Sequence, residues 1–106
     1  MYEYQAQITR VVDGDTVHAR VDLGLDVRID ITLRLYGINA PELSTDAGKL
    51  ARSWLIQRLA DVHTVTIRTY KDKREKYGRY LATLLDGDAD INAEMIAAGQ
   101  AVVYLP

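Results

Sequence analysis

The chain has no cysteine among its 106 residues. Disulfides and thiolate metal sites are therefore excluded, and any bound metal must take oxygen ligands or the two histidines, His18 and His63. These two histidines lack the spacing of a paired metal site. If the protein binds a metal, we expect the ligands to be oxygen atoms.

The sequence also lacks long apolar runs and an excess of basic residues. No segment approaches the roughly 20 apolar residues of a membrane-spanning helix, and residues 1–4 lack the basic and apolar regions of a signal peptide. We therefore expect no membrane partner, and a cytoplasmic protein if the chain is complete or a secreted one if a signal peptide was removed. The net charge of -2 argues against a protein that coats duplex nucleic acid.

Proline is scarce, and no linker rich in glycine, serine or proline divides the chain. We therefore expect one domain, residues 1–106, which acts as a monomer and buries about two thirds of the surface of its unfolded chain. Phenylalanine is absent, and seven of the eight aromatic residues are tyrosines, whose hydroxyl groups favour contact with water. Two of them, Tyr77 and Tyr104, lie beside other candidate site residues and are candidates for binding a phosphate or stacking on a base.

Alternation of apolar and polar residues predicts five β-strands. The strongest pattern covers residues 25–35, in which every second residue is apolar, as expected for a strand with one buried face. Residues 71–79 form a charged loop with five basic residues, a local positive patch on an acidic protein. The other predicted strands are residues 2–12, with a bulge or bend, 17–23, 62–70 and 80–85.

The pattern changes to that of an amphipathic helix in residues 43–60, with an apolar stripe that includes Leu50 and Trp54. Ser44 or Thr45 is expected to cap this helix. A second helix is predicted after Asn92, which we interpret as its cap, and Gly99 is expected to end it. Five strands, a helix between the third and fourth, and a helix after the fifth predict a small α+β fold, a closed barrel of the OB type.

The stretch 33–42 combines three features that suit phosphate chemistry. Arg34 lies on the non-core face near the end of the strongest predicted strand, residues 37–41 form a turn, and Glu42 follows. A guanidinium binds two oxygens at once, and a carboxylate accepts a proton. The alternative interpretation is an ordinary surface ion pair between Arg34 and Glu42.

Asp15 follows the turn dipeptide Asp13-Gly14. Because side chains alternate between the two faces of a strand, Asp15 falls on the same face of the next strand as its apolar residues. Its carboxylate would then point toward the interior, which is costly unless the charge is paired or bound to a metal. The alternative is that the turn rotates Asp15 outward.

Four separated pieces of the sequence together carry a resemblance. In their order and spacing they resemble the staphylococcal nuclease (thermonuclease) family, over nearly the whole chain. The resemblance implies an OB barrel with helices and calcium-dependent, sequence-nonspecific hydrolysis of DNA and RNA, with a preference for single-stranded or flexible substrate. The four pieces are residues 13–16, 34–42, 76–79 and 91–101.

The resemblance also implies roles for individual residues. Asp15 matches a calcium-ligating aspartate, and Arg34 and Arg79 match the two arginines that contact the scissile phosphate. Glu42 matches the glutamate that orients and deprotonates the attacking water. In-line attack places negative charge on the phosphate oxygens, which a divalent cation and two arginines would neutralise.

The resemblance also implies residues that bind the substrate. Lys76 and Tyr77 match a pair that holds a neighbouring phosphate. Tyr104 alone represents a pair of base-stacking tyrosines, and it lies one position away from where the family has them. Asn39 stands where the family commonly has a second calcium-binding aspartate, which predicts a weaker metal site. Ala40 replaces a threonine, but its backbone carbonyl is still available as a ligand.

The chain also ends before the family's usual C-terminal helix, so we expect a minimal version of the fold. Two alternatives to an active nuclease stay open. One is a noncatalytic module that binds nucleic acid or protein through the same fold. The other is a barrel used only for protein interaction, in which Arg34 and Glu42 form a surface pair.

Overall fold

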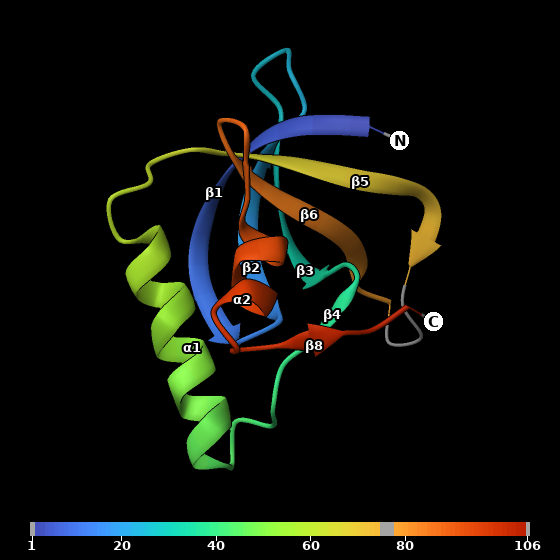
Figure 1. Ribbon diagram of the computed structural model, residues 1–106. Coiled ribbons are helices and arrows are strands. Elements are labelled where there is room, and N and C mark those ends of the chain that lie inside the picture. The colour runs from blue at the N-terminus through green and yellow to red at the C-terminus, as the bar shows by residue number, and fades with distance from the viewer. Residues whose placement is uncertain (1, 75–77, 106) are drawn as a thin grey trace.

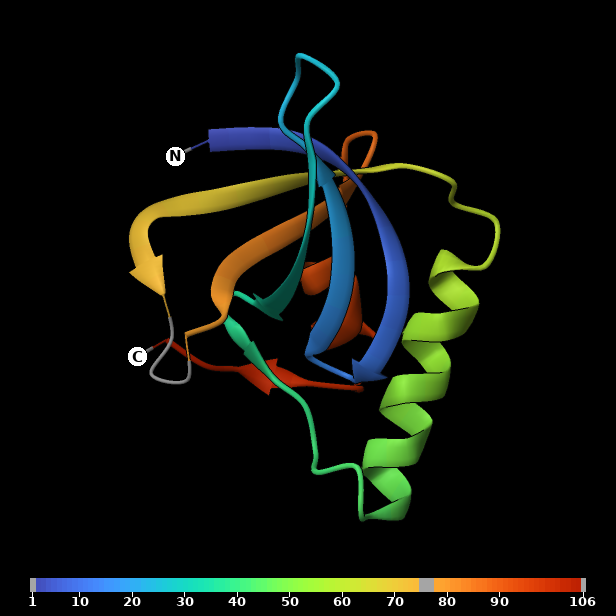
Figure 2. The same ribbon diagram turned by 180° about the vertical axis from the view of Figure 1, so that it is seen from behind.

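The computed structural model describes residues 2–74 and 78–105, and for residues 71–74 it describes the backbone alone. Its main feature is a β-barrel with two helices (Figures 1 and 2). The barrel strands are β1 (Tyr2–Asp13), β2 (Thr16–Asp22), β3 (Arg28–Leu35), β5 (Val65–Arg74) and β6 (Tyr80–Asp86). The remaining elements are β4 (Ile38–Asn39), α1 (Asp46–Leu59), β7 (Ala89–Asp90), α2 (Ile91–Ala97) and β8 (Val102–Val103).

The five long strands close into a mixed barrel. Their order is β3-β2-β1-β5-β6, with antiparallel neighbours, and a parallel pairing of β3 with β6 joins the two ends of the sheet. The predicted OB-type barrel is therefore confirmed, including the positions of both helices. Closure sets Leu33 opposite Tyr80, which places Arg79 beside the end of β3 that carries Arg34.

The predicted irregularity of the first strand is confirmed. The register of β1 against β2 shifts between Ile8 and Arg10 and again between Val11 and Asp13. Such bulges bend a strand and increase its twist. The curved β1 seen in Figure 2 pairs with β2 over most of its length and with β5 through residues 2–6.

The third strand begins later than its alternating pattern predicted. Leu25 and Asp26 have positive φ angles of 54° and 62°, and they form the tip of the β2–β3 hairpin, which projects beyond the barrel in Figures 1 and 2. Hydrogen bonds between Leu23 and Val27 and between Val27 and Gly24 close this turn. The apolar alternation continues through the turn, although Leu25 is 98% exposed, so the pattern overestimated the strand.

Helix α1 begins at Asp46, three residues later than predicted, and ends within one residue of the predicted end. Thr45 is the cap, as one of the two predicted candidates, because its Oγ1 accepts a hydrogen bond from the backbone N–H of Gly48. Trp54 packs against the core as predicted, but Leu50 is 64% exposed and does not belong to the buried stripe.

Two arginines fix α1 to the rest of the fold, alongside β1 (Figures 1 and 2). Arg52 donates from Nε to the carbonyl oxygen of Val11 at 3.1 Å. Arg58 forms ion pairs with Asp86 and Glu94, at 2.9 and 2.6 Å, and these carboxylates hold the pKa of its guanidinium above the ordinary value. Because these contacts attach both halves of α1, the loop that precedes the helix has a fixed end.

Asp90, and not Asn92, caps α2. The Asp90 carboxylate accepts a hydrogen bond from the backbone N–H of Ala93 at 3.0 Å, so the predicted cap is wrong by two residues. Gly99, with a φ of 73°, follows the last turn of the helix and confirms the predicted end.

Asn92 instead lies in the interior, 3% exposed, and connects β6 with the turn after β3. Its Oδ1 accepts a hydrogen bond from the backbone N–H of Leu84, and its Nδ2 donates to the carbonyl oxygens of Tyr36 and Ala82. Tyr36 follows Arg34 by two residues. Asn92 therefore holds the turn after β3 against β6.

We expect Asn92→Ala to lower the free energy of unfolding by about 2–3 kcal/mol, because the Leu84 N–H and the Tyr36 carbonyl lose the hydrogen bonds from Asn92, while the Ala82 carbonyl keeps the one from the Tyr36 N–H. Urea unfolding followed by circular dichroism measures this change, and Gln57→Ala on the exposed side of α1 is the control. An unchanged unfolding midpoint for Asn92→Ala would contradict the role given to this side chain.

The predicted loop at residues 71–79 is shorter than expected, because β5 continues to Arg74, which pairs with Tyr80.

Among the described residues, no helix is long and apolar enough to cross a membrane.

Candidate active site

The buried carboxylate of Asp15 and the guanidinium of Arg34 form the centre of the candidate site. Asp15 directly precedes β2, whose first residue, Thr16, lies opposite Arg34 in the β2–β3 register. Arg34 Nη2 lies 3.3 Å from Asp15 Oδ2, and the two side chains are only 13% and 11% exposed. The inward orientation predicted for Asp15 is confirmed, and Arg34 pairs with Asp15, so the surface pair with Glu42 is wrong.

Three further hydrogen bonds hold the Asp15 residue. Its carboxylate accepts from the backbone N–H of Ala40 at 2.8 Å and from the hydroxyl of Thr16 at 3.2 Å. Its own N–H donates to Asp13 Oδ1 at 3.0 Å. Burial and the neighbouring Asp13 carboxylate raise the pKa of Asp15, although the Ala40 N–H and Arg34 act in the opposite direction. Burial therefore favours the protonated form of Asp15, while the Ala40 N–H and Arg34 favour its carboxylate.

Arg34 is held by the turn that it precedes. Its Nη1 donates to the carbonyl oxygens of Leu35 and Ile38, each at 3.0 Å, and its Nη2 donates to the side-chain oxygen of Asn39 at 3.2 Å. Both Nη atoms therefore bind protein oxygens, and the guanidinium has a fixed position at the end of the barrel.

The parallel closure of the barrel brings Arg79 to the same network. Its Nη1 donates to the hydroxyl of Thr16 at 3.3 Å, and Thr16 in turn contacts Asp15. A continuous set of polar contacts thus connects Arg79, Thr16, Asp15 and Arg34. The sequence predicted no role for Thr16, although it belongs to one of the four pieces that carry the family resemblance.

Glu42 lies on the exposed loop between β4 and α1, two residues after Ala40. Its backbone carbonyl accepts hydrogen bonds from the N–H and the hydroxyl of Thr45, at 3.0 and 2.6 Å. Within the described part of the chain, its carboxylate has no hydrogen-bond partner and contacts neither arginine. The backbone of Glu42 is fixed by the start of α1, while its carboxylate is open to solvent.

Of the three predicted substrate residues, the structure describes Tyr104. Tyr104 is 51% exposed, and its N–H donates to the carbonyl oxygen of Gly37 at 2.9 Å, beside the turn that follows Arg34. The pairing of β8 with β4, which sets Val102 opposite Asn39, brings this end of the chain to the site. Lys76 and Tyr77 lie outside the described residues.

The three predicted metal ligands lie around this network. Asp15 and Asn39 each present a side-chain oxygen to Arg34, and Ala40 follows Asn39. Among the described residues, no group of three acidic or histidine side chains gathers closely enough to hold a metal. Carboxylate, amide and carbonyl oxygens are the ligand types that a hard cation takes, together with water, and in this structure Arg34 Nη2 contacts the Asp15 and Asn39 oxygens.

Comparisons with known proteins place the sequence in a family. A family model described as "Staphylococcal nuclease homologue" matches residues 32–105. The chain is 32% identical over 103 residues to a protein of Escherichia coli O157:H7 named "Uncharacterized endonuclease", covering 96% of this chain and 62% of that protein. It is 28% identical over 114 residues to "Endonuclease YhcR" of Bacillus subtilis strain 168, covering 96% of this chain and 9% of that protein.

Another similar protein is "Protein ParB" of Escherichia coli, 28% identical over 111 residues, with 96% of this chain and 58% of that protein covered. The chain thus spans about three fifths of these Escherichia coli relatives. The matched residues run from the last half of β3 through β8 and include both arginines, Glu42 and Tyr104, whereas β1, β2 and Asp15 precede them. The chain belongs to the family of staphylococcal nuclease homologues.

Proposed function

We propose that this protein is a calcium-dependent nuclease that hydrolyses phosphodiester bonds in DNA and RNA without sequence specificity and acts mainly on single-stranded or flexible substrate. The observation that carries this proposal is the contact network that connects Arg79, Thr16, Asp15 and Arg34 at one end of the barrel. The endonuclease names of two relatives support it.

The two arginines stabilise the charge that develops during hydrolysis. Attack on a phosphodiester increases the negative charge on the nonbridging oxygens, and fixed guanidinium groups neutralise it without reorganising. Arg34 binds protein oxygens through both Nη atoms. Among the described residues its Nε makes no hydrogen bond and so can donate to a phosphate oxygen, whereas Nη2 could do so only by releasing Asp15 or Asn39.

Glu42 accepts the proton of the attacking water. Its carboxylate is exposed, so water can reach it, and a hydrogen bond from that water to the carboxylate orients the nucleophile. The backbone contacts with Thr45 fix the loop that carries it. These contacts hold the backbone of Glu42 at the start of α1.

Asp15 and Asn39, with the backbone carbonyl of Ala40, would hold the calcium ion. When bound, this ion supplies positive charge to a phosphate oxygen and lowers the pKa of a bound water. The substrate residues in this proposal are Lys76 and Tyr77, for a neighbouring phosphate, and Tyr104, whose exposed ring is available to stack on an unpaired base.

We expect Asn39→Asp to strengthen calcium binding by roughly tenfold, because calcium affinity rises with the number of charged oxygen ligands. Isothermal titration calorimetry of the metal alone measures this change, with Asn39→Ala as the variant that loses the ligand. Equal affinities of Asn39→Asp and the parent protein would count against Asn39 as a ligand.

The activity is tested by incubating the protein with heat-denatured DNA and with RNA in the presence of calcium, magnesium or a chelator. The proposal predicts cleavage of both substrates with calcium and none with the chelator. A folded protein that binds these substrates but leaves them intact at millimolar calcium would instead be a noncatalytic binding module.

A further inference from the structure

A hollow of about 200 Å³ opens directly beside the candidate active site. Residues 39–41, from the last residue of β4 onward, form one wall, and residues 99–102, from the end of α2 to the first residue of β8, form the other. We propose that this neutral hollow binds the base of a nucleotide next to the scissile phosphate. The inference rests on the proposed nuclease function and adds a substrate-binding site to it.

The neutral hollow shares a wall with the phosphate-binding network. Asn39, which lines the hollow, accepts a hydrogen bond from Arg34 Nη2, and Ala40, its neighbour in the lining, donates to the Asp15 carboxylate. A phosphate at Arg34 is therefore in the immediate vicinity of the hollow. A nucleotide attached to that phosphate can therefore place its base in this hollow, on the side of residues 99–102.

The chemistry of the lining favours a base over a phosphate. No ionisable side chain lines the neutral hollow, so it offers nothing to neutralise a phosphate charge. Ala40, Pro41, Ala101 and Val102 provide apolar surface for the face of a base. An apolar lining with a few placed polar groups is typical of small-ligand sites.

Two side-chain amides supply the polar groups. In the part of the chain that the structure describes, the amide of Gln100 makes no hydrogen bond, and Asn39 uses only its oxygen, toward Arg34. An amide carries a donor and an acceptor side by side, and each base has such a pair on an edge. Gln100 is therefore the residue that we expect to bind the base.

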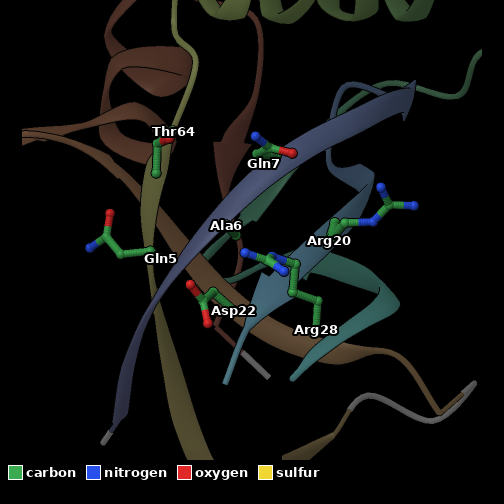
Figure 3. Close-up of a pocket in the computed structure, with 7 residues that line it drawn as sticks. All are labelled: Gln5, Ala6, Gln7, Arg20, Asp22, Arg28 and Thr64. Carbon is green, nitrogen blue, oxygen red and sulfur yellow. The ribbon is translucent and has the colours of Figure 1, made fainter. Parts of the chain in front are cut away.

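A second hollow, of about 140 Å³, serves as a comparison (Figure 3). Residues of β1, β2 and β3 and Thr64 line it, and Figure 3 shows the charged side chains of Arg20, Asp22 and Arg28 around it. Its Gln5 amide already donates to Thr66 at 2.9 Å, and it shares no lining residue with the candidate active site. Gln5 is therefore a matched control position for Gln100.

The test uses single-stranded tetranucleotides with one cleavable phosphodiester between two methylphosphonate linkages. One substrate is intact, and two others lack the base on one or the other side of the cleavable bond. One bound base contributes about five- to a hundredfold in affinity. We therefore expect kcat/KM of the parent protein to be lower by a factor in this range for one of the two abasic substrates. The decrease should come from a higher KM.

The penalty for a missing base is the ratio of kcat/KM for the intact substrate to kcat/KM for the abasic substrate. In Gln100→Ala and Gln100→Glu, we expect this ratio to fall several-fold for that base, while cleavage of the same abasic substrate stays at the parent rate. The penalty for the base on the other side and the behaviour of Gln5→Ala should match the parent. Equal cleavage of all three substrates, or an unchanged penalty in both Gln100 variants, would overturn this inference and leave the nuclease intact. A parent that cleaves none of them would overturn both.

Discussion

Arg34→Ala is expected to lower the rate of phosphodiester cleavage by at least about a hundredfold, because the loss of one fixed donor to a developing oxyanion costs that much. The guanidinium is the central group of the site, in contact with Asp15, Asn39 and the carbonyl oxygens of the turn. Single-turnover cleavage of a labelled single-stranded oligonucleotide measures the effect.

The same substitution should also lower stability, because it leaves the buried Asp15 carboxylate without its cation. Removing one partner of a buried ion pair costs about 3–5 kcal/mol, an upper bound here because Asp15 keeps the Ala40 and Thr16 hydrogen bonds. Arg34→Lys, which keeps the charge but not the planar fork, should recover stability more than activity. Wild-type cleavage by a folded Arg34→Ala protein would contradict the role of this residue.

Gly48→Ala is expected to lower kcat strongly and to destabilise the protein, because a Cβ at this position would overlap the carbonyl oxygen of Glu42. Alanine favours a helix over glycine by about 1 kcal/mol, so a helix without this contact would gain stability. Here the loop or the helix must move instead, at a cost of about 1–3 kcal/mol. Steady-state kinetics and urea unfolding measure the two effects.

The control for Gly48→Ala is Ser53→Ala, at an exposed position of the same helix. A double variant that carries both Gly48→Ala and Glu42→Gln separates two possible causes of lost activity, displacement of Glu42, the proposed base, and general damage to the fold. If Gly48 acts by positioning Glu42, then Gly48→Ala should cause little further loss of activity in the Glu42→Gln protein. A full additional loss in the double variant would mean that the effect of Gly48→Ala does not pass through Glu42.

Much of the barrel could be predicted because its strands have one buried face. The alternation in β2 and in the second half of β3 matches that face, although Ile29 at the start of β3 is exposed, and the bulges of β1 appear as breaks in its pattern. The start of β3 was missed because apolar residues continue through the hairpin turn, where positive φ angles at Leu25 and Asp26 end the strand. A local pattern therefore indicates the presence of a strand or helix more reliably than it indicates the residues at which that element begins and ends.

The contacts of the site depend on long-range pairing that no local pattern contains. Asp15 could be predicted to face inward from parity, but its contacts with Arg34 and Ala40 arise from strand register and from the β4 turn. Asn92 was mistaken for a cap because Asp90, two residues earlier, also suits that position. Its interior role depends on β6, which no helix pattern reveals.

The central claim is that a nuclease site combines the Asp15 and Arg34 pair with Glu42 as the base. Its most direct test is calcium-dependent cleavage of heat-denatured DNA by the parent protein and by Glu42→Gln, with circular dichroism to show that both are folded. We predict that the parent cleaves only with calcium and that Glu42→Gln is slower by about a hundredfold or more. Equal rates for the two proteins, or no cleavage by the parent at any calcium concentration, would contradict this account.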